Sequence, residues 1–170
     1  MAEKPKVRMI PLGGVDEIGK NMTVFEYGDD IIVVDCGLIF PQEDMLGVDL
    51  VIPDITYLTK NRERVRAFFI THGHEDHIGA IPYILQEVPA PVYGTRLTMA
   101  LVENKLKEHK VSGYQLNVVK PGDTVCAGSF SVGFLKVSHS IAGAVALAIE
   151  SPAGTILHTG DFKIDYTPID

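Results

Sequence analysis

Six consecutive residues, His72-Gly73-His74-Glu75-Asp76-His77, place four side chains that can bind a metal ion within one short segment. Imidazole and carboxylate groups are ligands for zinc, and also for manganese or iron. Three of the chain's six histidines lie here, a density that a loop exposed only to solvent does not explain. The segment therefore predicts a metal centre.

Three further polar residues follow predicted strands and extend the candidate ligand set. His139 comes directly after one predicted strand, and Asp161 follows another, with Gly160 permitting a tight bend. Asp35 ends the apolar run Ile31-Ile32-Val33-Val34. Taken alone, an aspartate at a strand end is more often a turn cap, but strand ends on one side of a sheet converge, and α/β folds place sites there. Together with the hexapeptide, these residues predict one shared site.

The spacing inside the hexapeptide suits two metal ions. Residues two apart in an extended segment point the same way, so its first two histidines can bind one ion, with His139 completing that site. Once the chain turns into a following helix, Asp76 and His77 can face a second ion. Two cations about 3.5–4 Å apart need a bridging carboxylate, for which Asp161 is suited. Such a pair lowers the pKa of a shared water and binds both oxygens of a transferring phosphoryl group.

The elements that must position these residues alternate between strands and helices. Apolar and alternating runs predict strands over residues 7–10, 23–27, 31–34, 66–70, 92–93, 116–119, 124–127, 129–137, 144–149 and 155–158. Helices are expected after Pro53-Asp54, over residues 79–87 with Pro82 in the first turn, and from a capping Thr95 to about residue 109. Pro11 is expected to end the first strand. The alternation favours a layered α/β domain.

Composition fits a folded domain and argues against some partners. The chain has 170 residues, a 46% apolar share and a formal net charge of −7. No whole-chain basic surface for nucleic acid is expected, although a site charged by metal ions escapes that objection. No apolar run has the length of a membrane span, and residues 1–6 lack the apolar core of a signal peptide, so a cytoplasmic location without a membrane partner is expected. Cys36 and Cys126 form no disulfide framework, and both are expected to be buried.

The order of the candidate ligands resembles the metallo-β-lactamase superfamily. That order, His-x-His-x-Asp-His and then a histidine and an aspartate, stands here as His72, His74, Asp76, His77, His139 and Asp161. Asp35 matches the family's early strand-end aspartate. The resemblance implies an α/β fold, an αββα sandwich of which this chain supplies the first part only. Its pattern fits hydrolases of lactams, thioesters and phosphodiesters, and Asp76 favours a two-metal phosphodiesterase.

Longer motifs narrow the resemblance to the ribonuclease J family of β-CASP ribonucleases. They cover residues 12–21, 40–49, 71–80, 91–95 and 158–163. One departure is Asp16, where the family pattern has glycine, and it leaves the conformation of that Gly-rich loop open. On this resemblance, residues 1–170 are the N-terminal part of a metallo-β-lactamase domain, and the β-CASP domain and C-terminal parts lie outside this chain.

The resemblance also implies a role for each candidate residue. The first metal ion would be bound by His72, His74, His139 and Asp161, and the second by Asp76, His77 and the shared Asp161. Asp76 would be catalytic by orienting the attacking hydroxide, and Asp35 would fix a ligand histidine from behind. The cofactors would be two zinc ions, with manganese or magnesium as alternatives. Gly47 and Asp49 would belong to a structural calcium site.

The implied activity is that of a metal-dependent ribonuclease. It would hydrolyse single-stranded RNA as a 5′→3′ exonuclease and endonuclease in mRNA decay and rRNA maturation, as a homo-oligomer when full length, with RNA-decay proteins as partners. Two alternatives stay open. One is another hydrolase on the same scaffold, such as a thioesterase of the glyoxalase II kind. The other is a catalytically incomplete fragment that binds metal, because a further histidine ligand and the RNA-gripping domain are expected elsewhere.

Overall fold

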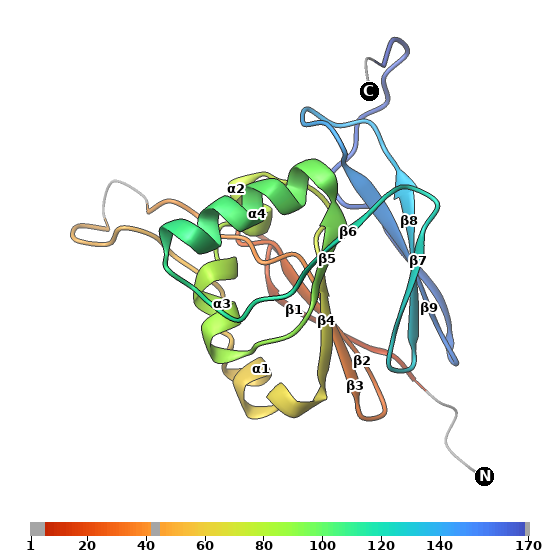
Figure 1. The fold of residues 1–170 in the computed structure, drawn as a ribbon, viewed down its shortest axis with the longest axis horizontal. Helices are drawn as coiled ribbons and strands as arrows, with labels where there is room; N and C mark the ends of the chain where they lie inside the picture. The colour runs from red at the N-terminus through yellow and green to blue at the C-terminus, as the bar shows by residue number, and fades with distance from the viewer. Residues whose placement is uncertain (1–5, 42–44, 169–170) are drawn as a thin grey trace.

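The computed structural model describes residues 6–41 and 45–168, which form three layers (Figure 1). A six-stranded sheet lies between a layer of helices and a second sheet of four strands. The first sheet contains, in spatial order, β1 (Arg8–Gly13), β2 (Met22–Tyr27), β3 (Asp30–Val34), β4 (Val65–Phe69), β5 (Val92–Thr95) and β6 (Leu116–Val119). The second contains β10 (Gly154–His158), β9 (Val145–Ser151), β8 (Phe130–Lys136) and β7 (Thr124–Ala127). The helices are α1 (Thr56–Lys60), α2 (Glu75–Ile78), α3 (Ile81–Glu87) and α4 (Arg96–Glu108), with a 3-10 turn over Arg62–Arg64.

The pairing direction in the first sheet changes at β3. Strands β1, β2 and β3 pair antiparallel, whereas β3, β4, β5 and β6 run parallel. Parallel neighbours need crossover connections, which explains why α1 to α4 all lie between β3 and β6 in the chain. Strand β3 is buried on both faces, as its continuous apolar run predicted.

Two apolar cores separate the three layers. One lies between the helices and the first sheet and includes Leu58 and Phe68. The other lies between the two sheets and includes Phe25, Phe69 and Phe134. Alternation along β4 sends Phe68 to one core and Phe69 to the other. No helix of the described residues covers the outer face of the second sheet, so these residues form the αββ part of the predicted αββα sandwich.

The predicted strands are all present, but the prediction that Pro11 ends the first strand is wrong. Strand β1 continues through Pro11, which pairs with Thr23, and the register shifts between Pro11 and Gly13. An edge strand tolerates a residue that lacks an N–H group. Thr95 stands at the N-cap of α4 without capping it, because its hydroxyl donates to the Gly143 carbonyl at 2.7 Å.

Two other expectations also need correction. The helix expected over residues 79–87 begins at Ile81, because a separate turn, α2, ends at Ile78 and carries part of the hexapeptide. Pro82 occupies the first turn of α3, as predicted. Cys36 is buried, but Cys126 is exposed, because strand alternation turns it outward from β7.

The candidate residues leave both sheets at one end of the molecule. Strands β3 and β4 are parallel, so Asp35 and the segment from Thr71 leave the first sheet at the same edge. Strands β8 and β10 both pair antiparallel with β9, so His139 and Asp161 also follow strands that end at one edge. The Val145 N–H donates to the Thr71 carbonyl at 3.0 Å and joins the two edges.

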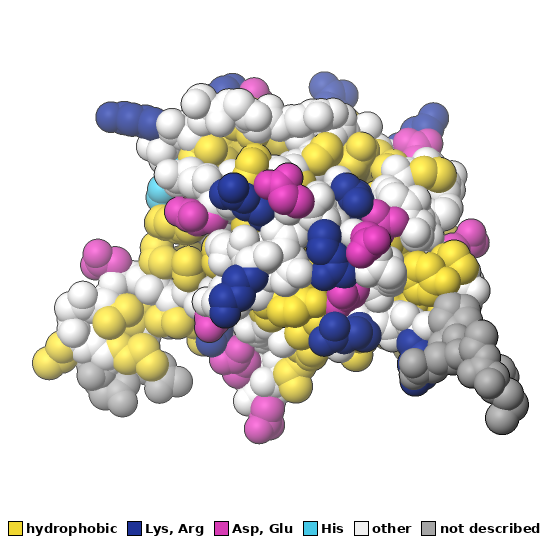
Figure 2. Space-filling view, turned by 90° about the horizontal axis from the view of Figure 1, so that it is seen from below, with side chains coloured by type: hydrophobic (Ala, Val, Ile, Leu, Met, Phe, Trp, Pro, Cys, Tyr) yellow, Lys and Arg dark blue, Asp and Glu magenta, His cyan; other side chains and the backbone are white. Residues whose placement is uncertain are grey.

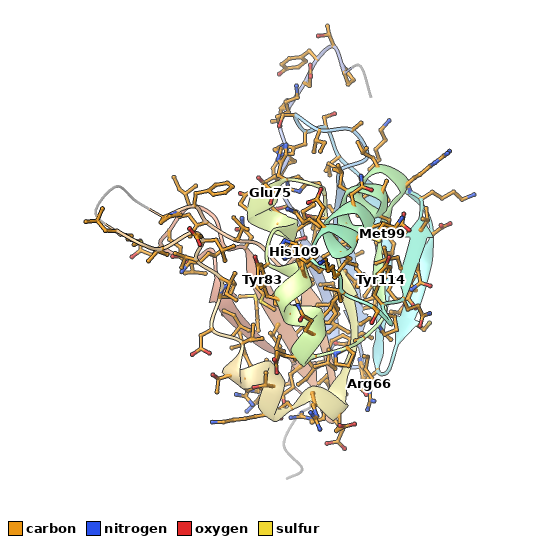
Figure 3. All side chains as sticks on the ribbon, turned by 60° about the vertical axis from the view of Figure 1, so that its left-hand side comes forward. Arg66, Glu75, Tyr83, Met99, His109 and Tyr114 are labelled. Carbon is orange, nitrogen blue, oxygen red and sulfur yellow. The ribbon has the colours of Figure 1, made fainter. Side chains whose placement is uncertain are left out.

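The opposite end of the molecule carries mixed charge. Figure 3 places Arg66 at this end and Glu75 near the candidate site. Figure 2, seen from below, shows Lys and Arg side chains interspersed with Asp and Glu, with no continuous basic surface among the coloured residues. A nucleic-acid backbone would meet both signs of charge on this face. No helix in the described part of the chain is long and apolar enough to cross a membrane.

A buried acid on β2 is expected to stabilise the fold. Glu26 accepts hydrogen bonds from Tyr57 and Arg64 and pairs with Arg8 at 3.1 Å. Burial opposes ionisation of Glu26, but these partners outweigh burial and hold its pKa below the usual 4.5. Glu26→Gln is therefore expected to lower the free energy of unfolding by about 2 kcal/mol at neutral pH.

The stability difference between wild type and Glu26→Gln should depend on pH, because the pKa of Glu26 is lowered in the folded protein. Because the folded-state pKa is lowered, the contribution is present above pH 4.5 and is lost as the pH falls through the folded-state pKa. Urea unfolding of both proteins at neutral pH and at about pH 3 measures it. A difference that stays constant across this range would contradict the assignment.

Candidate metal centre

The hexapeptide joins the end of β4 to the first turn of α2. His72 is fully buried, at 0% exposure. His74 occupies the extended N-cap position of α2, and Asp76 and His77 lie within that helix. An extended stretch followed by one helical turn directs all four side chains towards the same edge of the sheet, as their spacing predicted.

Three histidines form the first group of candidate ligands. His72 Nε2 lies 3.0 Å from His74 Nδ1, and His139 Nε2 lies 3.3 Å from the same His74 atom. Burial, followed by the nearby charge of His77, lowers the pKa of His72 to about 4. Burial is also the main reason that the pKa of His139 is lowered. Neutral imidazoles that turn their nitrogens towards one point fit a divalent cation.

A second group shares His72 with the first. The ligand atoms of His72, His77 and Asp161 lie within 4.8 Å of one another. His77 Nε2 is 3.6 Å from Asp161 Oδ1 and 3.6 Å from Asp76 Oδ2. The other oxygen of the shared aspartate, Asp161 Oδ2, is 3.7 Å from His139 Nε2 in the first group. One carboxylate therefore contacts both groups, with Asp76 at the margin of the second.

Asp35 lies buried behind the histidines. Its backbone has φ 62°, a left-handed conformation that aspartate tolerates better than most residues. The His77 Nδ1–H donates to Asp35 Oδ2 at 2.8 Å, and the Thr71 N–H donates to Oδ1 at 2.8 Å. Burial opposes ionisation of Asp35, but the His77 charge and these hydrogen bonds outweigh burial and hold its pKa below the usual range.

Thr71 and Asn21 belong to the site, and although both lie in motifs that resemble ribonuclease J, the sequence predicted no role for either residue. The Thr71 hydroxyl donates to Asp35 Oδ2 at 2.9 Å and lies 3.0 Å from His72 Nδ1, so its oxygen can accept a hydrogen bond from the Nδ1–H of His72. Both His72 and His77 then carry their proton on Nδ1, so Nε2 of each ring is unprotonated and faces the other candidate ligands.

The protonation of His77 is under opposing influences. Burial lowers the pKa of His77, but Asp35, Asp76 and Asp161 together raise it to about 8. Asn21 Nδ2 lies 3.1 Å from His77 Nε2, and an amide N–H approaches that nitrogen only when the nitrogen is unprotonated. The contact geometry fits the neutral ring, which is also the form that binds a metal ion.

The remaining histidines lie apart from both ligand groups. His158 Nδ1 accepts a hydrogen bond from the Gly160 N–H at 3.2 Å, behind Asp161. His109 ends α4 and packs edge-on against Tyr83, with 5.1 Å between ring centroids (Figure 3).

The residues of the predicted calcium site lie on the long connection between β3 and α1. Gly47 has φ 78°, and both Gly47 and Asp49 are exposed. Neither belongs to the two ligand groups found among the described residues, and residues 42–44 of the same motif lie outside them. The calcium site stays a prediction. Asp16 has φ 59°, so the Gly-rich loop keeps a left-handed turn at the position of the departure.

Gly37→Ala is expected to displace the first turn of α2. A Cβ on Gly37 would lie 1.6 Å from the Asp76 carbonyl oxygen and 2.7 Å from the Asn21 nitrogen. Both obstacles are backbone atoms, so we expect the free energy of unfolding to fall by about 3 kcal/mol. Gly133→Ala is the matched control, because its nearest neighbour would lie at 3.8 Å. Equal melting temperatures for the two variants would contradict this prediction.

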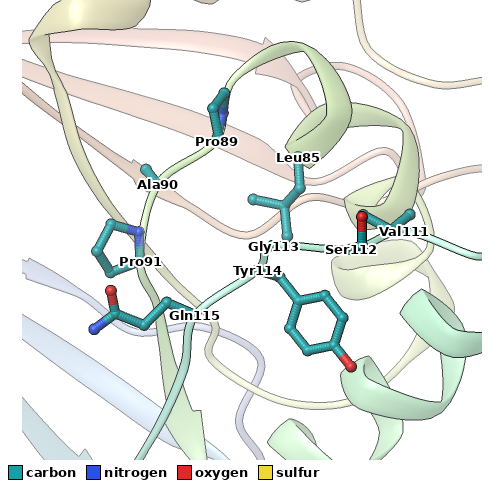
Figure 4. A pocket seen from close by; sticks show the side chains of 9 residues that line it. All are labelled: Leu85, Pro89, Ala90, Pro91, Val111, Ser112, Gly113, Tyr114 and Gln115. Carbon is teal, nitrogen blue, oxygen red and sulfur yellow. The ribbon is translucent and has the colours of Figure 1, made fainter.

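A polar cavity opens beside the second ligand group. It has a volume of about 340 Å³ and is lined by Gly13, Gly14, Asn21, His77, Asp161 and neighbouring residues. A different cavity, of about 240 Å³, lies between the end of α3 and residues 111–115 (Figure 4). That cavity is lined by Leu85, Pro89, Pro91, Tyr114 and neighbours and contains no candidate ligand. Of these two cavities, only the first is lined by candidate ligands.

Known proteins resemble this chain over most of its length. Residues 15–167 match the family model described as the metallo-beta-lactamase superfamily. The chain is 51% identical over 167 residues to ribonuclease J of Synechocystis, covering 96% of this chain and 26% of that protein. It is 47% identical over 172 residues to ribonuclease J of Thermus thermophilus, covering 96% and 30%. With ribonuclease J2 of Bacillus subtilis the identity is 46%, covering 95% and 29%. The chain thus spans about a quarter to a third of these relatives.

Solved structures agree on the fold. A protein of unknown function from Enterococcus faecalis superposes with a TM-score of 0.71 at 23% identity, covering 94% of this chain and 44% of that one. The metallo-beta-lactamase fold protein YhfI of Bacillus subtilis gives a TM-score of 0.65 at 20% identity, covering 96% and 65%. The strand-end histidines and aspartates, the matched family model and the ribonuclease J relatives agree: this chain belongs to the metallo-β-lactamase superfamily.

Proposed function

We propose that this chain supplies the two-metal centre of a ribonuclease that hydrolyses RNA phosphodiesters. The placement of Asp161 is the observation that carries the proposal, because its two oxygens lie 3.6 Å from His77 Nε2 and 3.7 Å from His139 Nε2. A carboxylate between two ligand groups suits a pair of metal ions that binds a transferring phosphoryl group. Relatives named ribonuclease J support RNA as the substrate.

The ligand assignment follows from the two groups. His72, His74, His139 and Asp161 would bind one ion, and His77, Asp76 and the shared Asp161 would bind the other. Zinc suits the imidazole-rich first group, and manganese or magnesium are the alternatives for a centre that also contains carboxylates. When bound, the ions would lower the pKa of a water molecule and neutralise charge on the phosphoryl oxygens.

The protein side chains would orient the reacting groups. The Asp76 side chain is 38% exposed at the margin of the centre, where Oδ2 can accept a hydrogen bond from the attacking water. Asp35 and Thr71 hold the Nδ1 protons of His77 and His72 and so fix both rings. In-line attack at phosphorus would leave a 5′-phosphate on the downstream product.

The basic side chains near the centre are paired with acids and would supply only part of the positive charge that an RNA backbone needs. Three lysines lie on segments leading to the centre, and each is paired with an acid: Lys20 with Glu17 at 3.0 Å, Lys105 with Glu75 at 2.7 Å, and Lys163 with Asp165 at 2.8 Å. We therefore place the residues that grip the RNA backbone in a β-CASP domain outside this chain. Exonuclease and endonuclease action in mRNA decay and rRNA maturation, oligomer formation, RNA-decay partners and a cytoplasmic location belong to this same proposal.

A substrate comparison tests the proposal against the thioesterase alternative. The whole protein that contains this chain is assayed on 5′-monophosphorylated single-stranded RNA and on a thioester, each with and without a divalent metal ion. We expect RNA cleavage that requires the metal ion and no turnover of the thioester. Thioester hydrolysis without RNA cleavage would favour the alternative hydrolase, and RNA cleavage that survives complete chelation would contradict the metal centre.

A further inference from the structure

We propose that Asn21 is a positioning residue that holds the Asp76 carboxylate towards the metal ligands. This inference rests on the proposed metal centre and adds to it a residue that is not a metal ligand. Asn21 comes from the turn between β1 and β2, whereas Asp76 lies in α2, so the contact joins segments 55 residues apart.

Asn21 contacts Asp76 through three hydrogen bonds. The Asn21 backbone N–H donates to the Asp76 carbonyl oxygen at 3.0 Å. The side-chain Nδ2 donates to the same carbonyl at 3.1 Å and to the Asp76 carboxylate Oδ2 at 3.3 Å. Backbone and side chain therefore act on the same residue, and the side chain reaches the atom that would face the metal ion.

The carboxamide oxygen of Asn21 lies against Gly14 of its own turn. A Cβ on Gly14 would lie 2.6 Å from Asn21 Oδ1, which places that oxygen against the backbone of its own turn. The amide nitrogen faces the ligands, and a protonated amide nitrogen does not bind a metal ion. Asn21 therefore acts on the centre through its amide N–H groups, which face the Asp76 carboxylate at 3.3 Å and His77 Nε2 at 3.1 Å.

Hydrogen bonds and an ion pair hold the turn that contains Asn21 in one conformation. Glu17 accepts a hydrogen bond from the Gly14 N–H at 3.1 Å and pairs with Lys20 at 3.0 Å. Lys20 donates its N–H to the Leu38 carbonyl at 3.2 Å. Four residues of the turn have positive φ: Gly14, Asp16, Gly19 and Lys20. Asp16 and Lys20 are not glycines, so their left-handed conformation is unfavourable by itself, and the turn that contains them brings Asn21 against α2.

The backbone around this contact leaves little space for movement. The Gly37 N–H donates to the Asn21 carbonyl at 2.9 Å, and a Cβ on Gly37 would overlap both the Asn21 nitrogen and the Asp76 carbonyl oxygen. The Asp76 carboxylate itself is less constrained, because its side chain is 38% exposed. Without the Asn21 amide, this carboxylate can rotate into solvent, and the second metal ion loses a preorganised ligand.

Metal titration of the whole protein tests the inference. Chelated protein is titrated with Mn²⁺ or Zn²⁺, and the two dissociation constants are measured for wild type and Asn21→Ala. We expect about 10- to 100-fold weaker binding at one site, as for other residues that orient a metal ligand, and less than about 2-fold change at the other. Asn117→Ala is the matched control, because this half-buried asparagine donates to the Val92 carbonyl far from the centre, and it should change neither constant.

A double-mutant cycle separates positioning from a general structural role. If Asn21 acts through Asp76, Asn21→Ala weakens binding by less than about 2-fold when it is introduced into Asp76→Ala. The inference would be overturned if Asn21→Ala weakened metal binding as much in Asp76→Ala as it does in wild type. It would also be overturned if Asn21→Ala alone bound metal with wild-type affinity. Tighter binding by Asn21→Asp would also overturn it, because the position would then act as a direct ligand. If wild type binds no metal ion, the metal centre fails and not the role of Asn21 alone.

Discussion

Asp161→Asn is expected to reduce RNA cleavage by about 10³-fold or more and to remove one metal ion from the protein. The substitution keeps the size of the side chain but replaces one carboxylate oxygen with an amide nitrogen, which cannot bind a metal ion. Asp161 contacts His77 with one oxygen and His139 with the other, so the loss affects both ligand groups. The Asp161 side chain is 47% exposed, so we expect little change in the melting temperature of the metal-free protein.

The control for this substitution is an acid four residues further along. Asp165→Asn removes a carboxylate that pairs with Lys163 at 2.8 Å and belongs to neither ligand group. Metal content and cleavage of 5′-monophosphorylated RNA are measured for both variants. Asp165→Asn should retain two ions and wild-type activity. Equal activity of the two variants would show that Asp161 does not bridge the groups.

His77→Ala is expected to affect both stability and activity. Removing the ring leaves the buried Asp35 carboxylate without the hydrogen bond from His77 Nδ1–H, and a hydrogen bond to a charged group contributes about 1.5–3 kcal/mol. The backbone and hydroxyl bonds from Thr71 remain, which places the expected loss at the lower end of that range. The second ion also loses its histidine ligand, so RNA cleavage should fall by about 10³-fold or more. Urea unfolding and the cleavage assay measure the two effects separately.

A second substitution distinguishes these two consequences. Adding Asp35→Asn to His77→Ala removes the buried charge, so part of the lost stability should return while cleavage stays low. If cleavage returned together with stability, His77 would serve folding and not the metal centre. If the double variant were less stable than His77→Ala, the buried carboxylate would not be the source of the cost.

The hexapeptide and the strand-end residues could be predicted from the sequence because their signals are local. Apolar runs define the strands, and a polar residue directly after each run defines an edge. His139 and Asp161 lie far apart in the chain, yet both follow strands that pair antiparallel with β9, so their meeting follows from the sheet topology. Pro11 shows the limit of local rules, because only the edge position of β1 explains why the strand continues through it.

Asn21 and Thr71 could not be predicted, because their contacts depend on tertiary packing. Asn21 reaches α2 only through a turn with four residues at positive φ, and no periodicity in the sequence indicates that path. Thr71 precedes His72 directly, but its bond to Asp35 requires β3 and β4 to be neighbours. The same packing explains Thr95, whose hydroxyl binds Gly143 although its position favours a helix cap. Asp35, which also orients a ligand, could be predicted because it directly follows an apolar strand, whereas Asn21 and Thr71 carry no such local signal.

The central claim is that these histidines and aspartates bind two divalent metal ions on which RNA cleavage depends. The most direct test titrates the chelated whole protein with Zn²⁺ or Mn²⁺ and follows cleavage of 5′-monophosphorylated single-stranded RNA at each step. The account predicts no cleavage in the metal-free protein and a rate that rises until two ions are bound per chain. Full cleavage by the metal-free protein, or a maximal rate with a single ion bound, would contradict it.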